Sequence, residues 1–501
     1  MQKRQILINA IMSVVQIIVM SGVLFILYRF LLNIIGVEQL GIWSLVLATT
    51  SVSNIANLGL SGSVVKFVAK YIAREEHEKV SRVIQTAAIS IALFIGIAVL
   101  IGYPVIKWIL GLVIPDKNLS LAISILPYTV VSLWIMTITS VFQAGLDGNQ
   151  RIYLRNILLM GGSILYFLLA IIITPLHGLI GLAYAQIIQN ITVLLFSWIL
   201  LKRYIPLPII PYQWDKGVFK EIVGYSINFQ VISITQMLCD PITKALLSKF
   251  GGLSIVGYYE MANRMILQFR ALIVSANQVI VPAIADLQEK TPEKIRSAYL
   301  TSYRLVFYFA VPLFSLIIIC TPLISELWIG HYEKIFVIFA ILLSIGWLLN
   351  TLSAPAYFSN LGIGTLRWNV MSHIVISVLN IGLGFLLGIF YDGIGIVAAW
   401  TISLALGSSV IHISYHLTHK ITLLELLPQA SRKILVLCLV GIFFSFLIQN
   451  RFNHNVNGLL FNGLIIFIFS IIIFFSLWLH PVQRQLMRWI RNELLNRKAE
   501  A

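Results

Sequence analysis

The chain has 501 residues, of which 59% are hydrophobic and only 11% are charged, whereas soluble domains carry about a quarter charged residues. This composition excludes a chain built from soluble domains. Apolar runs of about 20 residues recur from end to end, and each is long enough to cross a bilayer as a helix. The sequence therefore predicts an all-α, polytopic membrane protein.

Fourteen apolar segments follow one another along the chain, and each is predicted to be a membrane-spanning helix. In chain order they lie near residues 9–32, 42–64, 85–106, 121–145, 157–174, 179–201, 222–247, 256–285, 303–325, 335–358, 368–390, 394–415, 433–450 and 459–479.

The net charge of +16 raises the question of nucleic acid, but the distribution of the basic residues indicates membrane topology instead. With the N-terminus inside, most of the 35 Lys and Arg residues fall at cytoplasmic ends of the spans and in cytoplasmic loops. This positive-inside pattern predicts a multi-pass protein of the cytoplasmic membrane with both termini in the cytoplasm. The basic loop 66–82 and the basic tail 484–498 are expected to face anionic lipid headgroups, and no nucleic acid partner is predicted.

The sequence repeats weakly at a distance of about 216 residues, which aligns Gly36 with Gly252 and Gly41 with Gly257. The matched segments are GVEQLGIW (36–43) with GLSIVGYY (252–259), GNQR (148–151) with GTLR (364–367), and GLAYA (181–185) with GIVAA (395–399), the last pair displaced by two residues. One repeat unit holds six helices. Because six is even, both copies have the same orientation and are related by an axis along the membrane normal.

The repeat predicts the domain organisation. Residues 1–201 form an N-terminal lobe of spans 1–6, residues 202–219 a cytoplasmic linker rich in proline and basic residues, residues 220–420 a C-terminal lobe of spans 7–12, and residues 421–501 two additional spans with a basic cytoplasmic tail. Two lobes around a central cavity are the plan of a transporter that exposes one site alternately to either side of the membrane.

The motifs of common enzyme classes are missing from the sequence. It contains no GxxxxGK[ST], HExxH, GxSxG or DxDxDG-type loop, so neither an enzyme activity nor a cofactor is predicted. His412, His416 and His419 share one helical face, but without a nearby carboxylate or cysteine they are predicted to lie at the membrane interface rather than to bind a metal. Gly384 and Gly388 are predicted to allow close helix packing.

Spans 7 and 8 are polar along one face at membrane depth. A charge there costs about 2.5–3.5 kcal/mol even on the more lenient insertion scale, so it normally faces a cavity or a partner. The polar residues of each span fit on one side of a helical projection. They are Ser226, Gln230, Ser233, Gln236, Asp240, Thr243, Lys244 and Ser248 in span 7, and Glu260, Asn263, Arg264, Gln268, Arg270, Ser275, Asn277 and Gln278 in span 8. Lys249 lies off this face, near a short outer turn predicted at Gly251 and Gly252.

The charges on these faces have two interpretations. Asp240 and Lys244 are four residues apart, as are Glu260 and Arg264, so each pair can be an ion pair within one helix that merely lets the helix insert. Alternatively, Asp240 or Glu260 titrates and couples transport to an ion.

Two basic residues of the spans have no acidic residue one turn away. These are Arg270 and Arg29, and Arg29 can extend to the outer surface. The intramembrane balance is then four basic residues (Arg29, Lys244, Arg264 and Arg270) against two acidic ones (Asp240 and Glu260). A net cationic cavity favours an anionic substrate, and arginine is well suited to phosphate.

With these features, the chain resembles the multidrug/oligosaccharidyl-lipid/polysaccharide (MOP) exporter superfamily, and within it the polysaccharide transporter family of O-antigen-type flippases. The resemblance covers essentially the whole length. Besides the fourteen spans and the repeat, it rests on Asp240 and Lys244, followed by FGG (250–252), VGYY (256–259) and ANR (262–264), and on LGLSGSVVKFVAKY (58–71).

The resemblance implies a flippase that moves a polyprenyl-pyrophosphate-linked oligosaccharide, such as an O-antigen, capsule or exopolysaccharide repeat unit, across the cytoplasmic membrane by alternating access. Arg264, Arg270 and Lys244 would hold the pyrophosphate, and Arg29 matches the family more loosely. The implied partners are this anionic lipid-linked oligosaccharide, membrane lipids and polysaccharide polymerase machinery. Two alternatives stay open: an ion-coupled small-molecule exporter of the multidrug (MATE) type and a flippase for the lipid-linked peptidoglycan precursor.

Overall fold

The structure, a computed structural model, describes residues 2–51, 60–278, 280–427, 429–451 and 456–478. Parts of three sequence predictions lie outside this description. They are residues 52–59 of the second span, the basic tail 484–498, and the side chains of Ser226, Gln230, Ser233 and Gln236 on the polar face of span 7.

All regular structure in the described residues is helical, which confirms the predicted fold class. The α-helices are α1 (Gln2–Ser51), α2 (Leu60–Ala73), α3 (His77–Val113), α4 (Asp116–Gly148), α5 (Ile152–Lys202), α6 (Lys216–Gly251), α7 (Leu253–Asn277), α8 (Ile280–Lys290), α9 (Ile295–Ile329), α10 (Lys334–Leu352), α11 (Ala354–Ile363), α12 (Arg367–His419), α13 (Leu423–Leu426), α14 (Gln429–Arg451) and α15 (Val456–Trp478). A short 3-10 helix, η2 (Pro292–Lys294), precedes α9.

Three helices are too long for one membrane crossing because each contains two helices that meet at a kink. The backbone leaves the helical region at Gly36 in α1, at Gly178 in α5, and at Tyr391 and Asp392 in α12. Each kink falls between two predicted spans. In α5 and α12 the structure therefore keeps both spans, and in α1 it keeps the first span and the described start of the second. In each case the loop between the spans is reduced to the kink itself.

Eight helical segments of the described residues are long and apolar enough to cross a membrane. α7 is not among them, although it contains most of predicted span 8. Glu260, Arg264 and Arg270 give this helix more charges than an apolar span normally carries. α7 is therefore a charged helix in a largely apolar bundle.

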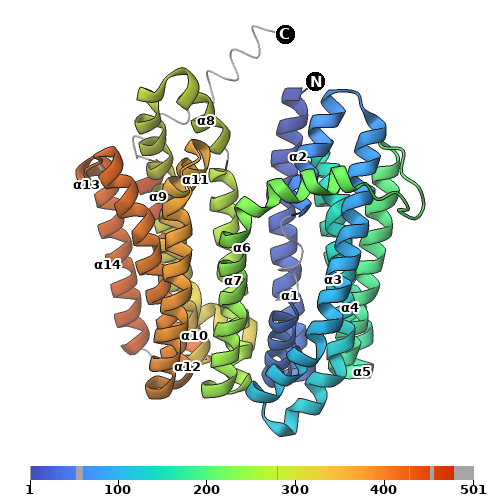
Figure 1. Ribbon diagram of the computed structural model, residues 1–501. Coiled ribbons are helices and arrows are strands. Elements are labelled where there is room, and N and C mark those ends of the chain that lie inside the picture. The colour runs from blue at the N-terminus through green and yellow to red at the C-terminus, as the bar shows by residue number, and fades with distance from the viewer. Residues whose placement is uncertain (1, 52–59, 279, 428, 452–455, 479–501) are drawn as a thin grey trace. The chain divides into compact units, whose positions relative to one another are not determined.

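Contacts within the chain divide it into two units. Unit 1 comprises Met1–Met261 and Asn380–Ile396, and unit 2 comprises Ala262–Leu379 and Val397–Ala501. Within unit 1, α4 packs against α3 and α5, and α1 packs against α5 and α6, so that long helices run side by side (Figure 1). Within unit 2, α9 is central and contacts α10, α11, α14 and α15.

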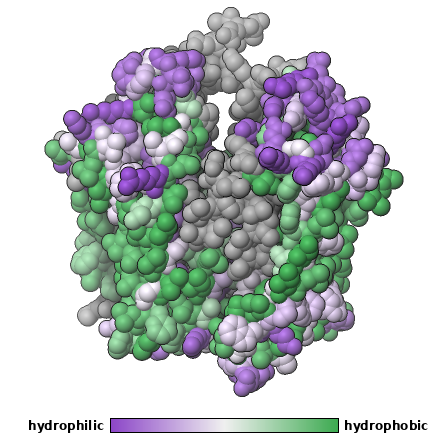
Figure 2. All heavy atoms as spheres, in the orientation of Figure 1, coloured by the Kyte–Doolittle hydropathy of each residue, from purple (hydrophilic) through white to green (hydrophobic). Residues whose placement is uncertain are grey.

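Each unit carries a broad hydrophobic surface between hydrophilic ends on the face shown in Figure 2. Large apolar side chains are exposed in both units to an extent that water would penalise: Leu100 and Leu176 of unit 1 are 76% and 74% exposed, and Phe446 of unit 2 is 63% exposed. Surfaces of this kind and size are covered by lipid in a membrane protein. The chain is therefore a multi-pass membrane protein, as the composition predicts.

The backbone repeats where the sequence does. Gly36 (φ 77°, ψ 168°) and the aligned Gly252 (φ 90°, ψ 170°) adopt the same conformation, which favours glycine because φ is positive. Gly252 also forms the turn between α6 and α7, as predicted. Further along, Gly178 (φ 57°, ψ −136°) and Asp392 (φ 49°, ψ −139°) match each other at the offset of the displaced GLAYA and GIVAA segments.

Within unit 1, the second half of α1 and the first turns of α7 contact each other through the aligned glycines. A Cβ on Gly41 would lie 1.9 Å from the carbonyl oxygen of Leu253, and a Cβ on Gly257 would lie 2.4 Å from that of Val37. Since Val37 aligns with Leu253 at the same offset, exchanging the two copies reproduces the contact. Such a pair of equivalent contacts is expected when two segments are related by a two-fold axis.

Candidate functional site

The candidate site residues fall into two clusters, which are described separately because they belong to different units. In unit 1, Lys244 on α6 lies between two carboxylates: its Nζ is 2.7 Å from Asp240 Oδ2 and 2.8 Å from Glu260 Oε2. The turn at Gly252 brings α6 and α7 together and so allows the contact between helices. We call Asp240, Lys244 and Glu260 the ion triad.

Two members of the ion triad are buried, and the third is exposed to solvent. The side chains of Lys244 and Glu260 are 3% and 2% exposed, whereas that of Asp240 is 43% exposed. The hydroxyl of Tyr28 on α1 donates a hydrogen bond to Glu260 Oε1 (3.1 Å). Buried opposite charges offset their loss of hydration only when they are paired and hydrogen-bonded, and Glu260 meets both conditions.

The predicted Asp240–Lys244 pair within α6 is confirmed. The contact of Lys244 with Glu260 on the neighbouring helix is an additional finding, since the spacing along one helix pointed Glu260 toward Arg264. The side chains of Arg264 and Arg29 are exposed. Lys249 is exposed as well, near the turn where the sequence placed it.

The helix that carries Lys244 is fixed against the first half of α12. Asn380 Nδ2 donates to Thr243 Oγ1 (3.0 Å), next to Lys244 in the chain. A Cβ on Gly384 would lie 2.9 Å from the Leu246 side chain, and one on Gly388 would lie 3.1 Å from that of Phe250, which confirms the predicted close packing at both glycines. The helix segment that carries Lys244 is therefore tightly packed within unit 1.

In unit 2, Arg270 on α7 is held by two side chains of α10. Its Nη2 donates to Asn350 Oδ1 (2.8 Å), and its guanidinium carbon lies 4.7 Å from the centre of the Trp347 ring. Asn350 Nδ2 donates in turn to Ser408 Oγ on α12 (2.9 Å), and Trp347 Nε1 donates to Asn263 Oδ1 (3.1 Å). We call Arg270, Asn263, Trp347, Asn350 and Ser408 the Arg270 cluster.

The Arg270 cluster contains a positive charge and no negative one. Among the described residues, the ion pairs do not include Arg270, and its buried Nε meets no hydrogen-bond acceptor. Its partners are a neutral amide and an aromatic ring, which orient a guanidinium without cancelling its charge. A half-buried arginine arranged in this way attracts an anion.

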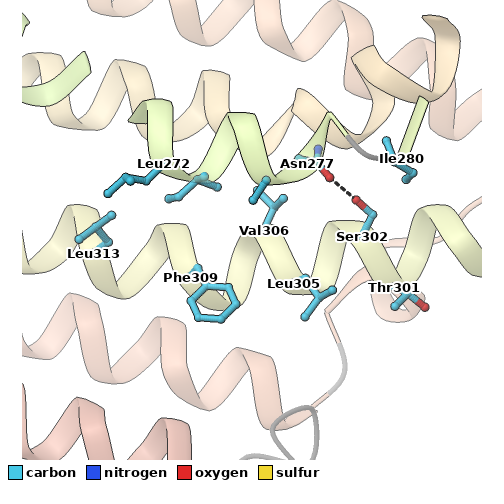
Figure 3. Close-up of a pocket in the computed structure, with 11 residues that line it drawn as sticks. Leu272, Asn277, Ile280, Thr301, Ser302, Leu305, Val306, Phe309 and Leu313 are labelled. Atoms are coloured by element: carbon cyan, nitrogen blue, oxygen red, sulfur yellow. Dashed lines mark hydrogen bonds between the residues drawn. The ribbon is translucent and has the colours of Figure 1, made fainter. Parts of the chain in front are cut away.

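An apolar cavity of about 650 Å³ begins one turn beyond Arg270 in unit 2. Ile273 and Asn277 follow Arg270 at spacings of three and seven residues, so they lie on nearly the same face of α7 and line the cavity. The opposite wall comes from α9, and Ser302 donates to Asn277 Oδ1 at one end (Figure 3). The remaining lining residues are largely apolar: Leu272, Ala276, Ile280, Thr301, Leu305, Val306, Phe309 and Leu313. An anion-attracting group and an apolar cavity thus follow each other along one helix.

The histidines of α12 lie in an aromatic cluster within unit 2. His416 Nε2 is 2.6 Å from the Tyr299 hydroxyl, and His412 contacts the Tyr303 ring edge-on at 5.8 Å between ring centroids. In the described part of the chain, no three His, Cys, Asp or Glu side chains are grouped so that they could hold a metal ion. These histidines therefore form contacts between α12 and α9.

The fold of this chain is similar to that of solved membrane transporters. The lipid II flippase MurJ, in an inward closed conformation, matches with a TM-score of 0.70 over 94% of this chain and 99% of its own, at 16% identity. An inward-facing multidrug transporter of the MATE family, from the MOP superfamily, matches with a TM-score of 0.67 over 80% of this chain and 96% of its own, also at 16% identity.

The family follows from the sequence comparison. A family model described as polysaccharide biosynthesis protein matches residues 26–333, which is more than half of the chain, and the chain belongs to this family. A proposed O-antigen transporter of Shigella flexneri is 20% identical over 397 residues, or 77% of this chain and 92% of that protein. The predicted polysaccharide family is thus confirmed, and the fold is similar to that of a solved transporter of the MOP superfamily.

Several residues of the two clusters were not predicted from the sequence. Trp347 and Asn350 lie in span 10 and Tyr28 in span 1, and sequence spacing does not report contacts between distant spans. Asn350 did carry a signal, because an amide in the middle of an apolar span usually has a polar partner. The identity of that partner required the fold.

Proposed function

We propose that the protein is a flippase that moves a polyprenyl-pyrophosphate-linked oligosaccharide across the cytoplasmic membrane by alternating access. The observation that carries this proposal is the Arg270 cluster, a guanidinium within the membrane bundle whose partners are all uncharged. Family membership and the printed description of the Shigella flexneri relative support it.

A lipid-linked pyrophosphate combines an anion with a long apolar chain, and unit 2 offers surfaces for both. Arg270 would hold the pyrophosphate, and the cavity between α7 and α9, which begins about 5 Å further along the helix, could take the apolar chain. Arg264 and Arg29 have exposed side chains and stay candidates for the same anion. A substrate-binding role for Lys244 would require it to leave one of its two carboxylates.

Replacing Arg270 tests the proposal. In a complementation assay, with a strain that lacks its own oligosaccharide flippase, Arg270→Ala should abolish polysaccharide export at a normal protein level. Arg270→Lys should retain part of the export, because lysine keeps the charge and loses the planar fork of donors. Arg432→Ala, at an exposed arginine of α14, is the matched control and should export normally. Normal export by Arg270→Ala would refute the role of the cationic cluster.

The ion triad favours one alternative, an ion-coupled small-molecule exporter, because such exporters use buried carboxylates. Asp240 or Glu260 could also couple a flippase to an ion gradient, and this role stays a prediction. Drug susceptibility of the complemented strain separates the two functions. A strain depleted of its lipid II flippase tests the second alternative, transport of the lipid-linked peptidoglycan precursor.

A further inference from the structure

The indole N–H of Trp400, on the second half of α12, has no acceptor. The side chain is 6% exposed, and no hydrogen-bond acceptor of the described residues reaches its Nε1. Other indole N–H groups of the chain donate normally: Trp134 to Ala92, Trp198 to Pro208, Trp214 to Ser90 and Trp347 to Asn263. Trp400 therefore departs from the pattern of its own chain.

A buried donor without an acceptor lowers stability, because the N–H loses its hydrogen bond to water and gains nothing in return. Phenylalanine would fill most of the same space without that cost. A tryptophan at this position therefore indicates a use for the N–H itself.

The Trp400 ring lies beside the Arg270 cluster. Its centroid is 6.0 Å from that of Trp347, in an edge-to-face contact, and the Arg270 guanidinium stacks on the same Trp347 ring. The Nε of Arg270 is the second buried donor here that no described acceptor reaches. Two unpaired N–H donors thus flank one indole, in a cluster without a carboxylate.

The position of Trp400 relative to Arg270 is set by its neighbours. Thr401 Oγ1 donates to the carbonyl oxygen of Leu342 on α10 (3.0 Å). A Cβ on Gly346 would lie 3.2 Å from the Thr401 Cα, so the two backbones are in close contact at this point. The bond from Asn350 to Ser408 ties the same two helices further along. The two donors are therefore held by a packed scaffold.

We infer that Trp400 donates its indole N–H to a phosphate oxygen of the anion that Arg270 binds. The inference rests on the proposed function and adds a second substrate-contacting residue to it. An indole N–H donates and cannot accept, so it favours an anionic oxygen and disfavours an ammonium group. Trp400 would thus help the site to select phosphate over cationic molecules.

The test uses the purified full-length chain in lipid nanodiscs, with farnesyl pyrophosphate as the probe. Trp400→Phe should weaken its binding about ten- to a hundredfold, the effect of losing one hydrogen bond to a charged group. The Tm without ligand should stay the same or rise, since the substitution removes an unpaired donor. Trp328→Phe is the matched control: this tryptophan is 1% exposed, lies in the same unit and should leave the affinity unchanged.

A resonance of the N–H gives an independent readout. In protein labelled with ¹⁵N-tryptophan, one indole signal, absent from Trp400→Phe, should shift when farnesyl pyrophosphate is added and stay in place with farnesol. Inorganic pyrophosphate tests whether the prenyl chain is needed. An equal shift of the indole signal shows that the pyrophosphate group suffices, and a smaller shift shows that the prenyl chain contributes. In both cases the inference is supported.

Two outcomes overturn the inference. One is wild-type affinity in Trp400→Phe. The other is a parallel loss of Tm and affinity, which would mean that the N–H has a structural partner, such as a bound water. The Arg270→Ala variant separates this failure from that of the proposed function. If Arg270→Ala loses binding and Trp400→Phe does not, only the role of Trp400 falls. If both variants bind farnesyl pyrophosphate normally, the proposed phosphate site at Arg270 is refuted together with the role of Trp400.

Discussion

Lys244 shows how one residue decides the electrostatics of unit 1. Its ammonium group forms an ion pair with one carboxylate of its own helix and one of the next, and it is nearly inaccessible to solvent. Sequence spacing predicts a basic neighbour for both carboxylates, because each has one four residues further along its helix. It could not show that a single lysine serves both, because that depends on how α6 and α7 pack across the turn at Gly252.

Removing the Lys244 charge should destabilise the protein. Lys244→Met leaves Glu260 buried beside an apolar side chain, and breaking a buried pair in this way typically costs about 3–5 kcal/mol. Thermal unfolding of the purified protein should show a lower Tm, and the double variant Lys244→Met/Glu260→Gln should recover much of it. Lys249→Met, at an exposed site of the same helix, is the control and should unfold like the wild type. An unchanged Tm in Lys244→Met would show that the ion triad does not stabilise the fold.

For Arg270, residue patterns predicted the unpaired charge but not the side chains that contact it. Its lack of an acidic residue one turn away singled it out, and the structure shows it without an ion pair in the described part of the chain. Its partners Asn350 and Trp347 lie 80 and 77 positions away in the sequence, and no local periodicity connects them. The charge could be predicted from the sequence, whereas the orientation of the guanidinium could not.

At the scale of the elements, apolar length and helical periodicity predicted most of the fold. In the described residues the predicted spans lie in helices, although span 8 is divided between α7 and α8 and span 10 between α10 and α11. Loop lengths were less predictable, because single residues such as Gly36, Gly178 and Asp392 turn the backbone without interrupting the helical hydrogen-bonding pattern for long. A glycine in an apolar run can lie at a kink, at a close helix contact or beside open space, and only the fold shows which of these applies.

The contact between α1 and α7 should depend on Gly41. Gly41→Ala would place a methyl group 1.9 Å from the carbonyl oxygen of Leu253, and backbone cannot move aside as a side chain can. We expect a loss of about 1–3 kcal/mol, the usual cost of overpacking, and a lower Tm. Gly22→Ala in the same helix is the matched control, since nothing lies within 4 Å of its Cβ position. That variant should be neutral or slightly stabilised, by up to about 1 kcal/mol. Equal Tm values for the two variants would contradict a tight contact at Gly41.

At the scale of the whole molecule, the weak sequence repeat has a structural counterpart. Few identities support the repeat, yet the same backbone angles recur at Gly36 and Gly252 and again at Gly178 and Asp392. Backbone conformation at turns is retained where side chains have diverged, because few residues tolerate a positive φ. The repeat and the positive-inside pattern together predict that both termini and the linker share the cytoplasmic side.

Membrane-impermeant maleimide labelling tests this topology. Lys216→Cys, at the start of α6, should react only after the cells are permeabilised, because the excess of basic residues predicts a cytoplasmic linker. Lys334→Cys, at the start of α10, should react in intact cells. Both lysines are exposed, so accessibility differs only by the side of the membrane. The background should be low, since the native Cys239 and Cys438 are buried and Cys320 is partly buried. Labelling of Lys216→Cys in intact cells would invert the topology, and with it the direction in which Arg270 would first meet a substrate made in the cytoplasm.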